Sequence, residues 1–377
     1  MLERQEAIAG WKTPLFGSYY HQTGYVVAAT IRAPAKATEH LEKALSSIAS
    51  HPAFAKHIQE LKHPDDFRDL TWQYTGLLTG FKGYYNRLAG YAHSSDALRG
   101  IAQHCVDRNV HFVLGDTTGR VDGLIYKNDG GRCVGIRTAD GTEHHADTVI
   151  CALGAHDAVL LPSLAKLVTA RCWSVAHVQL IESETNWLRG IPTTNVRDLG
   201  FFFEPDPKTK LFKICPLGAG LTNTNSEGSS LPPRDDEAPH DLNYTPAADE
   251  KKLRQLLRET FPWMADRPFV HNKMCWFADT ADSEYCIDFV PGSSNSLVVL
   301  SGASGHGSKM MPVFGKWVAE FLVTGFQKLE RWRWRDADMR GKDWASAVSW
   351  RIGQGMDWKD FVKESEEAAV GRGSARL

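Results

Sequence analysis

The sequence predicts an α/β fold with two domains. The chain has 377 residues, enough for two domains of ordinary size, and 42% of its residues are apolar, which is sufficient for a sizeable core. Between residues 296 and 324, a short apolar run of strand type is followed by a glycine-rich loop and then by apolar residues at helical spacing. A strand, a tight loop and a helix in this order are typical of α/β proteins.

The composition argues against several classes of partner. The formal net charge of −2 argues against a nucleic-acid ligand. No apolar stretch reaches the roughly 18 residues of a membrane span, and the charged, helical start of the chain is unlike a signal peptide. The seven cysteines include no CxxC pair and no zinc-like histidine spacing accompanies them, so we expect neither a disulfide framework nor a metal. We expect a monomer.

Several elements can be placed from apolar spacing and turn residues. The patterns predict helices over 2–16, 38–50 and 247–261, a strand over 24–28, and a long exposed loop over 222–244. Asp140-Gly141 predicts a hairpin turn, with the first strand over 131–138. Towards the end of the chain, we expect a strand over 296–301 and a helix over 310–324.

The loop between those last two elements is the most informative segment. Gly302 to Gly307 lies where unpaired backbone N–H groups and the positive end of a helix dipole converge, which favours an anionic or electron-rich group. One basic residue, Lys309, stands at the helix start, and Cys275 lies upstream on a separate strand.

Three interpretations of this loop compete. A Walker phosphate cradle is disfavoured because Lys309 falls one position late and Met310 follows it instead of a hydroxyl residue. A tight turn that uses glycines only for positive φ is the second possibility. The third is a loop that packs against a flavin ring, with the helix dipole stabilising negative charge on the reduced ring.

The third interpretation is favoured because the segment C-W-F-A-D-T-A-D, starting at Cys275, and S-G-H-G-S-K-M-M-P, ending at Pro312, have a familiar order. They resemble the sarcosine oxidase and fructosyl amino acid oxidase (amadoriase) branch of the D-amino-acid-oxidase-like FAD enzymes. The resemblance implies a two-domain FAD-oxidase fold, with a Rossmann-like FAD domain and a mixed-sheet substrate domain. It covers most of residues 11–340. By resemblance we also expect a helix over 95–108 and strands over 110–115, from 120, over 146–155, over 200–205 and over 211–215.

The resemblance also implies a division of the chain. The FAD domain would comprise 1–28, 89–165 and 275–330, the substrate domain 29–88 and 166–274, and 331–377 would form a C-terminal tail. The family's N-terminal βαβ unit with G-x-G-x-x-G is not found in the sequence, so the FAD domain is expected to be incomplete. Its parallel sheet would lack central strands and expose apolar faces. A truncated, inactive paralogue or a binding module without FAD therefore remains an alternative.

The site residues are carried over by resemblance. Cys275 would form a thioether to the 8α-methyl of the flavin, the alternative being an ordinary buried cysteine. Lys213 would lie over the flavin face and activate dioxygen, the alternative being an edge-strand lysine in solvent. Lys309 would anchor a substrate carboxylate, or else extend into solvent as a helix-start lysine. The remaining cofactor-binding residues would be Val121, Gly154, Ala155, Gly302, Gly305, His306 and Gly307.

These roles imply an oxidase of secondary amines of amino-acid type. By resemblance, hydride would pass from the carbon next to nitrogen to the flavin, and water would hydrolyse the resulting imine. The reduced flavin would pass two electrons to dioxygen and give hydrogen peroxide. The motif agreement favours a fructosyl amino acid substrate, whereas Cys215-Pro216-Leu217-Gly218 departs from the polar, often histidine-bearing family sequence. The C-terminal Ala375-Arg376-Leu377 fits the pattern read by a peroxisomal import receptor, so we expect a peroxisomal location.

Overall fold

A computed structural model describes residues 2–127, 131–234, 237, 243–336, 338, 340 and 351–374. Within these residues, one ten-stranded sheet dominates, with the order β18-β14-β10-β13-β12-β11-β2-β4-β3 and with β15 paired to β10. Its strands are β2 (Tyr25–Ala29), β3 (Ile58–Leu61), β4 (Lys82–Asn86), β10 (Val168–Gln179), β11 (Thr193–Val196), β12 (Gly200–Phe202), β13 (Leu211–Pro216), β14 (Leu221–Thr222), β15 (Phe269–Thr280) and β18 (Met356–Asp357).

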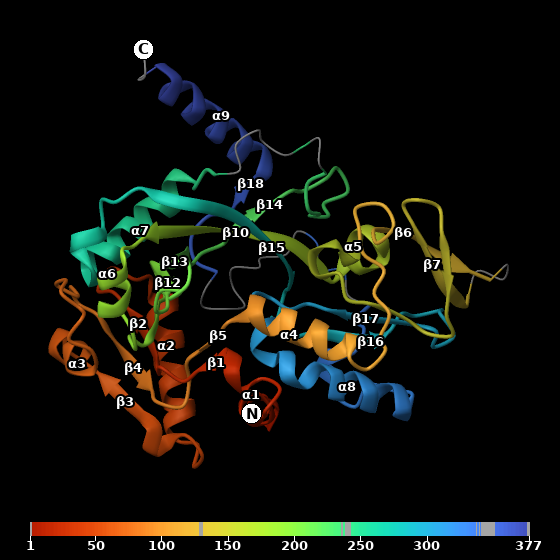
Figure 1. The fold of residues 1–377 in the computed structure, drawn as a ribbon, viewed down its shortest axis with the longest axis horizontal. Coiled ribbons are helices and arrows are strands. Elements are labelled where there is room, and N and C mark those ends of the chain that lie inside the picture. The colour runs from red at the N-terminus through yellow and green to blue at the C-terminus, as the bar shows by residue number, and fades with distance from the viewer. Residues whose placement is uncertain are drawn as a thin grey trace.

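Three smaller sheets complete the strands of the described residues (Figure 1). One has the order β16-β17-β9, in which β17 is parallel to β9 and antiparallel to β16. The other two are the antiparallel sheet β6-β7-β8 and the ribbon β1-β5. Their strands are β1 (Tyr20–His21), β5 (Tyr91–Ala92), β6 (Val121–Tyr126), β7 (Cys133–Thr138), β8 (Glu143–His145), β9 (Val149–Cys151), β16 (Cys286–Phe289) and β17 (Leu297–Ser301). The mixed strand orientations confirm the predicted α/β class.

Helices connect and cover these sheets. The α-helices are α1 (Leu2–Trp11), α2 (Ala35–Ala49), α3 (Pro64–Leu70), α4 (Ser94–Val106), α5 (Asp157–Leu160), α6 (Glu182–Trp187), α7 (Ala247–Thr260), α8 (Met311–Thr324) and α9 (Trp358–Ser374). Short 3₁₀ helices are η1 (Gly17–Tyr19), η2 (Ala55–His57), η3 (Gly154–His156), η4 (Pro162–Lys166), η6 (Pro262–Met264), η7 (Gly307–Met310) and η8 (Glu330–Trp332). In the described part of the chain, no helix is long and apolar enough to cross a membrane.

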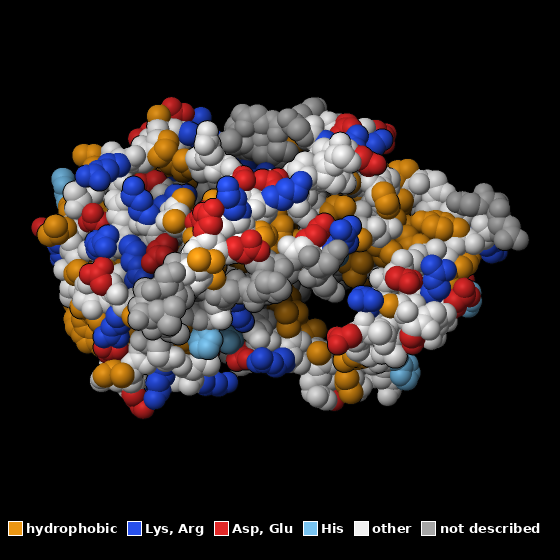
Figure 2. Space-filling model, turned by 90° about the horizontal axis from the view of Figure 1, so that it is seen from above, with side chains coloured by type: hydrophobic (Ala, Val, Ile, Leu, Met, Phe, Trp, Pro, Cys, Tyr) orange, Lys and Arg blue, Asp and Glu red, His pale blue; other side chains and the backbone are white. Residues whose placement is uncertain are grey.

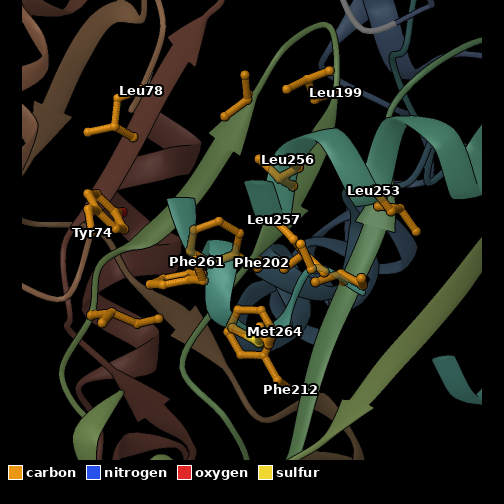
Figure 3. Close-up of a cluster of buried hydrophobic side chains, with 14 of the residues drawn as sticks. Tyr74, Leu78, Leu199, Phe202, Phe212, Leu253, Leu256, Leu257, Phe261 and Met264 are labelled. Atoms are coloured by element: carbon orange, nitrogen blue, oxygen red, sulfur yellow. The ribbon is translucent and has the colours of Figure 1, made fainter. Parts of the chain in front are cut away.

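The main core lies between α7 and one face of the ten-stranded sheet. Helix α7 buries Leu253, Leu256 and Leu257, which recur at helical spacing on one side of the helix. Figure 3 shows these leucines beside Phe202 and Phe212 from the sheet and Phe261 from the end of α7. A fully buried side chain of this size contributes about 1.5–3 kcal/mol relative to an exposed one, so this face supplies much of the stability.

The opposite face of the sheet is covered at its β2–β4 end by α2. Val27, Ala29 and Tyr84 from the strands pack there with Leu41 from the helix. Because side chains alternate between the two faces of a strand, Val26 and Ala28 point the other way, into the core beneath α7. The two faces of the sheet are therefore covered by different helices.

The C-terminal segment is part of the fold. β18 pairs with β14, and Trp358 and Phe361 of α9 are buried in a cluster with Cys172 and Leu221 of the sheet. Arg351 is buried and forms an ion pair with Asp279 of β15, which also pairs with Arg171 at 3.3 Å. Figure 1 shows α9 pointing away from the rest of the chain at its C-terminal end.

Most expected elements are confirmed, but the strand predicted over 110–115 is wrong. The segment has no strand structure, and Val110, Phe112, Val113 and Leu114 are exposed. A strand needs a hydrogen-bonded neighbour, and β9, the edge strand of the β16-β17-β9 sheet, has no strand on its outer side among the described residues. Ile150 of β9 and Leu153 beyond it are also exposed, as expected for a sheet that lacks neighbouring strands.

The loop predicted over 222–244 needs a smaller correction. Ser229 and Ser230 are buried, because the Ser230 hydroxyl donates a hydrogen bond of 2.6 Å to the Ala170 carbonyl of β10. A bridge between Thr224 and Ser230 closes this part of the loop. This segment is thus held against the sheet rather than exposed throughout. The proposed domain boundaries stay a prediction.

Candidate functional site

The candidate site lies on the face of the ten-stranded sheet opposite α7. On β13, Phe212 and Ile214 point into the core, so the residue between them, Lys213, points to the other face. β13 runs between β10 and β12, and Lys213 is half-buried. The edge-strand interpretation of Lys213 is therefore wrong. Its Nζ lies 5.8 Å from the centre of the Phe203 ring, a cation–π contact that helps to fix its position.

Cys275 lies on the same face, two strands away. It pairs with Trp173 of β10, and its side chain is exposed, which rules out the alternative of a buried core cysteine. The Trp173 ring meets the Phe277 ring edge to face, with 4.9 Å between centroids. An exposed thiol beside two aromatic rings is accessible to a flat ligand that packs on this face.

The glycine loop, residues 302–307, packs against these rings. A Cβ atom at Gly305 would lie 3.3 Å from the Trp173 ring, so the loop backbone packs closely against this ring. Gly302 and Gly305 have φ of 75° and 73°, and Ser304 between them has φ of 48°. The loop is thus held in left-handed conformations, which non-glycine residues rarely adopt.

Hydrogen bonds hold this loop to the strand that carries Cys275. The Ser304 N–H donates to the Ala278 carbonyl at 2.7 Å, and the Thr280 N–H donates to the Ser304 hydroxyl at 3.1 Å. Ala278 and Thr280 belong to β15, the strand that also carries Cys275. These hydrogen bonds therefore fix the position of the loop relative to Cys275.

His306 has a structural role through its side chain. Its Nε2 donates to the Ser283 carbonyl at 3.0 Å, and its Nδ1 accepts from the Tyr285 hydroxyl at 2.9 Å. Both ring nitrogens form hydrogen bonds that fix the loop, so a polar contact of His306 with a cofactor would be made by its backbone. Gly307 has little space for a side chain. A Cβ atom at this position would lie 2.8 Å from the Ala303 Cβ.

Lys309 follows at the start of the helical segment. The Trp11 indole N–H of α1 donates to the Lys309 carbonyl at 2.7 Å, which fixes the backbone, and the side chain is exposed. The structure therefore places the Lys309 side chain at the surface, at the start of the helical segment.

Gly154 and Ala155 reach the site from the small sheet. They lie in η3, directly after β9, and η3 contacts β10, β15 and β17. Gly154 has φ of 61° and open space where a Cβ would point. Val121, by contrast, lies on β6 in the separate β6-β7-β8 sheet and shares no sheet with the other predicted site residues.

Sequence reasoning missed two polar residues at this site. Asp157, directly after η3, is fully buried, and its carboxylate accepts a hydrogen bond of 2.7 Å from the Leu153 N–H. Burial raises the pKa of Asp157 to about 6. His177 of β10 lies directly across from Lys213 in the β10–β13 register. For Asp157, the available signal was an acidic residue three positions after Gly154. For His177, nothing in the sequence singled it out.

The site is an open face rather than a closed cavity. Two cavities lie elsewhere, one beside the 288–295 loop with Gly325 and Arg333, the other beside Ser163 and Trp334, and neither contains a predicted site residue. Figure 2 shows a deep opening through the middle of the molecule, towards the end at which β6 and β7 lie, with hydrophobic side chains along part of its rim.

Comparisons with known proteins agree with this geometry. The family described as "DAO: FAD dependent oxidoreductase" matches residues 4–321. The chain is similar to L-saccharopine oxidase of Schizosaccharomyces pombe, with 28% identity over 378 residues that cover 94% of this chain and 83% of that protein.

Two solved structures extend the comparison. The fructosamine oxidase amadoriase II from Aspergillus fumigatus is 31% identical, with a TM-score of 0.80 over 94% of this chain and 81% of that one. Fructosyl peptide oxidase from E. terrenum is 25% identical, with a TM-score of 0.82 over 96% of this chain and 82% of that one. The predicted resemblance and the predicted two-domain fold type are both confirmed.

Proposed function

Because the chain belongs to the DAO family of FAD-dependent oxidoreductases, we propose that it oxidises secondary amines of amino-acid type and uses dioxygen as the electron acceptor, releasing hydrogen peroxide. The observation that carries the proposal is the convergence of Lys213, Cys275 and the glycine loop on one open face of the sheet.

The residues present fit the ring end of FAD. Gly154 leaves open space beside η3, Gly305 brings backbone within reach of the Trp173 ring, and Cys275 presents an accessible thiol. No G-x-G-x-x-G motif for the pyrophosphate occurs in the sequence. Hence the residues named above would supply the surface for the flavin ring.

Each residue then has a defined task. The chemistry that bound FAD supplies is the two-electron oxidation of a carbon–nitrogen bond. Cys275 would hold the cofactor through a thioether. Lys213 would place a fixed positive charge where dioxygen acquires negative charge. Lys309 would bind the substrate carboxylate at the positive end of a helical segment.

The substrate is proposed at the level of its chemical class. The relatives named above are a saccharopine oxidase, a fructosamine oxidase and a fructosyl peptide oxidase, and their substrates share a secondary amine. Sequence motifs favour a fructosyl amino acid. The segment Cys215-Pro216-Leu217-Gly218 departs from the polar family sequence after Lys213, so a different group next to the nitrogen is compatible with the same chemistry.

The test has two parts. First, the absorption spectrum of the purified chain is recorded before and after acid precipitation; flavin bands that remain in the pellet support the covalent link, and flavin in the supernatant removes it. Second, peroxide release is measured with fructosyl-glycine, saccharopine, sarcosine and pipecolate. A colourless chain that also fails to bind added FAD would contradict the proposal and favour the inactive paralogue.

We also propose that the protein is imported into peroxisomes through Ala375-Arg376-Leu377, which lie outside the described residues. A peroxide-producing oxidase would act there beside enzymes that destroy peroxide. Helix α9, described to Ser374, points away from the body in Figure 1, which supports access of a receptor to this end of the chain. Deleting the three residues from a fluorescent fusion should disperse its punctate signal; an unchanged pattern would overturn the proposal.

A further inference from the structure

We propose that His177 is the base that removes a proton from the substrate's ammonium nitrogen before oxidation. The inference rests on the proposed function and assigns a catalytic role to a residue that the sequence did not single out. Secondary amines are protonated near neutral pH, as alkylammonium groups with pKa values near 10 are. A protonated nitrogen has no lone pair with which to form the imine, so an enzyme of this class needs a proton acceptor at the site.

The placement of His177 meets the first requirement of such a base. His177 lies directly across from Lys213 in the antiparallel β10–β13 pair. Directly opposite residues of an antiparallel pair share a face, with Cβ atoms about 4.5–5.5 Å apart. The ring is half-buried, and it lies on the same open face as Lys213 and Cys275.

A distortion in the neighbouring strand orients the ring. The register between β10 and β15 shifts between Val175 and His177, which marks a β-bulge. His271, at this shift, has φ of 50°, and its backbone carbonyl accepts a hydrogen bond of 3.0 Å from His177 Nδ1. Bulges of this kind often redirect a side chain next to an active site.

That hydrogen bond decides which nitrogen can act. A carbonyl oxygen only accepts, so Nδ1 carries the hydrogen and Nε2 of the neutral ring holds the free lone pair. Within the described part of the chain, Nε2 has no hydrogen-bond partner of its own. The acceptor nitrogen is therefore available to a ligand on the open face.

Burial and the neighbouring positive charges favour the neutral form of the His177 ring. The charged and titratable groups that act on His177 are Lys213 from β13 and Lys273 and His271 from β15. Burial is the largest effect and lowers the pKa of His177, while the hydrogen bond to the His271 carbonyl raises it. Lys213, Lys273 and His271 lower it further, so the net shift of this pKa is downward. Both lysine charges act on the imidazole, and the Lys213 ammonium is placed by its contact with the Phe203 ring.

The proton step balances without an electron transfer. One N–H bond of the substrate ammonium breaks, its electron pair stays on nitrogen, and the proton forms an N–H bond at His177 Nε2. The resulting imidazolium loses this proton to water, because Lys213 and Lys273 disfavour a third positive charge. The neutral amine is then ready for oxidation at the adjacent carbon.

The first test compares pH profiles of amine oxidation for the flavin-loaded wild type and His177→Gln. We expect a deficit of about 100-fold near pH 7, a typical contribution of a general base. The deficit should shrink towards pH 10, where the amine is neutral in solution, and added imidazole should rescue His177→Ala at pH 7. An equal deficit at every pH would show a merely structural role and overturn the proposal. His145→Gln, an exposed histidine on β8, is the matched control.

The second test does not depend on turnover. ¹⁵N NMR of histidine-labelled wild type should show an unprotonated His177 Nε2 at pH 7.5, and His177→Gln assigns the signal. Lys273→Glu, on the exposed edge strand β15, should raise the pKa of His177 and move the acid limb of the activity profile to higher pH. An Nε2 that carries hydrogen at pH 7.5, or a profile unmoved by Lys273→Glu, would overturn the role of His177.

The outcomes separate the two proposals. A flavin-loaded wild type that oxidises none of the amines contradicts the proposed function and the base together. An active wild type whose pH profile His177→Gln leaves unchanged contradicts the base alone.

Discussion

The two faces of strands β10 and β13 are built for different purposes, although their residues alternate in one short stretch of sequence. The face beneath α7 carries Phe212, Ile214 and Ala176, all fully buried. The opposite face carries Lys213 and His177, both half-buried. The first face is filled by side chains of the protein itself, whereas the second leaves polar groups accessible.

The difference teaches where stability and chemistry lie in this molecule. Changes on the face beneath α7 should act on folding, because they remove packed apolar contacts. Changes on the open face should act mainly on the reaction, because the side chains there are half-buried or exposed and make fewer packed apolar contacts. Four substitutions test this division.

The largest expected effect is that of Phe261→Ala. Phe261 is fully buried and its ring lies 5.2 Å from that of Phe202 and 5.7 Å from that of Phe212. Its truncation should lower the free energy of unfolding by about 3–5 kcal/mol. Denaturant titration measures the loss, with Val323→Ala, at an exposed position of α8, as the control. A loss below about 1 kcal/mol would mean that this core does not hold the sheet and α7 together.

Lys213→Met tests the open face. Methionine keeps the length of the side chain and removes the charge, so the free energy of unfolding should change by less than about 0.5 kcal/mol. The rate of the oxygen-dependent step should fall by about 10²–10³-fold, while reduction of the flavin by substrate without oxygen is retained. Stopped-flow measurements separate the two steps. Equal oxygen reactivity in variant and wild type would refute the role of Lys213.

Asp157 sharpens the comparison, because it is polar and yet fully buried. Its pKa rises from 3.8 to about 6 on folding. The folded state thus binds this proton more tightly, and the associated stability is present below pH 4 and is lost as the pH rises to about 6. A shift of about two units corresponds to about 3 kcal/mol.

Asp157→Asn should abolish the pH dependence of the free energy of unfolding between pH 4 and 6. Denaturant titration at each pH measures this free energy. Asp147→Asn, at a fully exposed side chain, is the matched control and should keep the wild-type slope. If Asp157→Asn keeps the same slope, the proton is bound elsewhere.

The smallest effect on folding is expected for Cys275→Ser. The thiol is exposed on an edge strand, so the free energy of unfolding should change by less than about 0.5 kcal/mol. The change should appear only in the cofactor, as flavin that moves from the acid pellet to the supernatant. Flavin that stays in the pellet would show that another residue forms the covalent bond.

Much of the fold could be predicted from local patterns. The strand at Leu297–Ser301, the glycine loop and the helix at Met311–Thr324 were expected because their apolar periods are clear and the loop needs left-handed backbone. The strand expected over 110–115 did not form, because strand formation depends on a neighbour that local sequence does not report.

The site could be predicted only in part. Lys213 and Cys275 were expected by resemblance, and the structure places them on one face. His177 could not be found, because its orientation depends on a bulge at His271 that comes from the pairing of two distant strands. Asp157 was missed because its burial arises from tertiary packing around η3.

The outer edge of β9 has a consequence for handling the protein. It ends the β16-β17-β9 sheet among the described residues, and Ile150 of β9 is 45% exposed. An apolar, unpaired edge is a template for extended segments of other molecules. We therefore expect the purified chain to aggregate as its concentration rises, with light scattering as the readout, and a lysine introduced at Ile150 to improve its solubility.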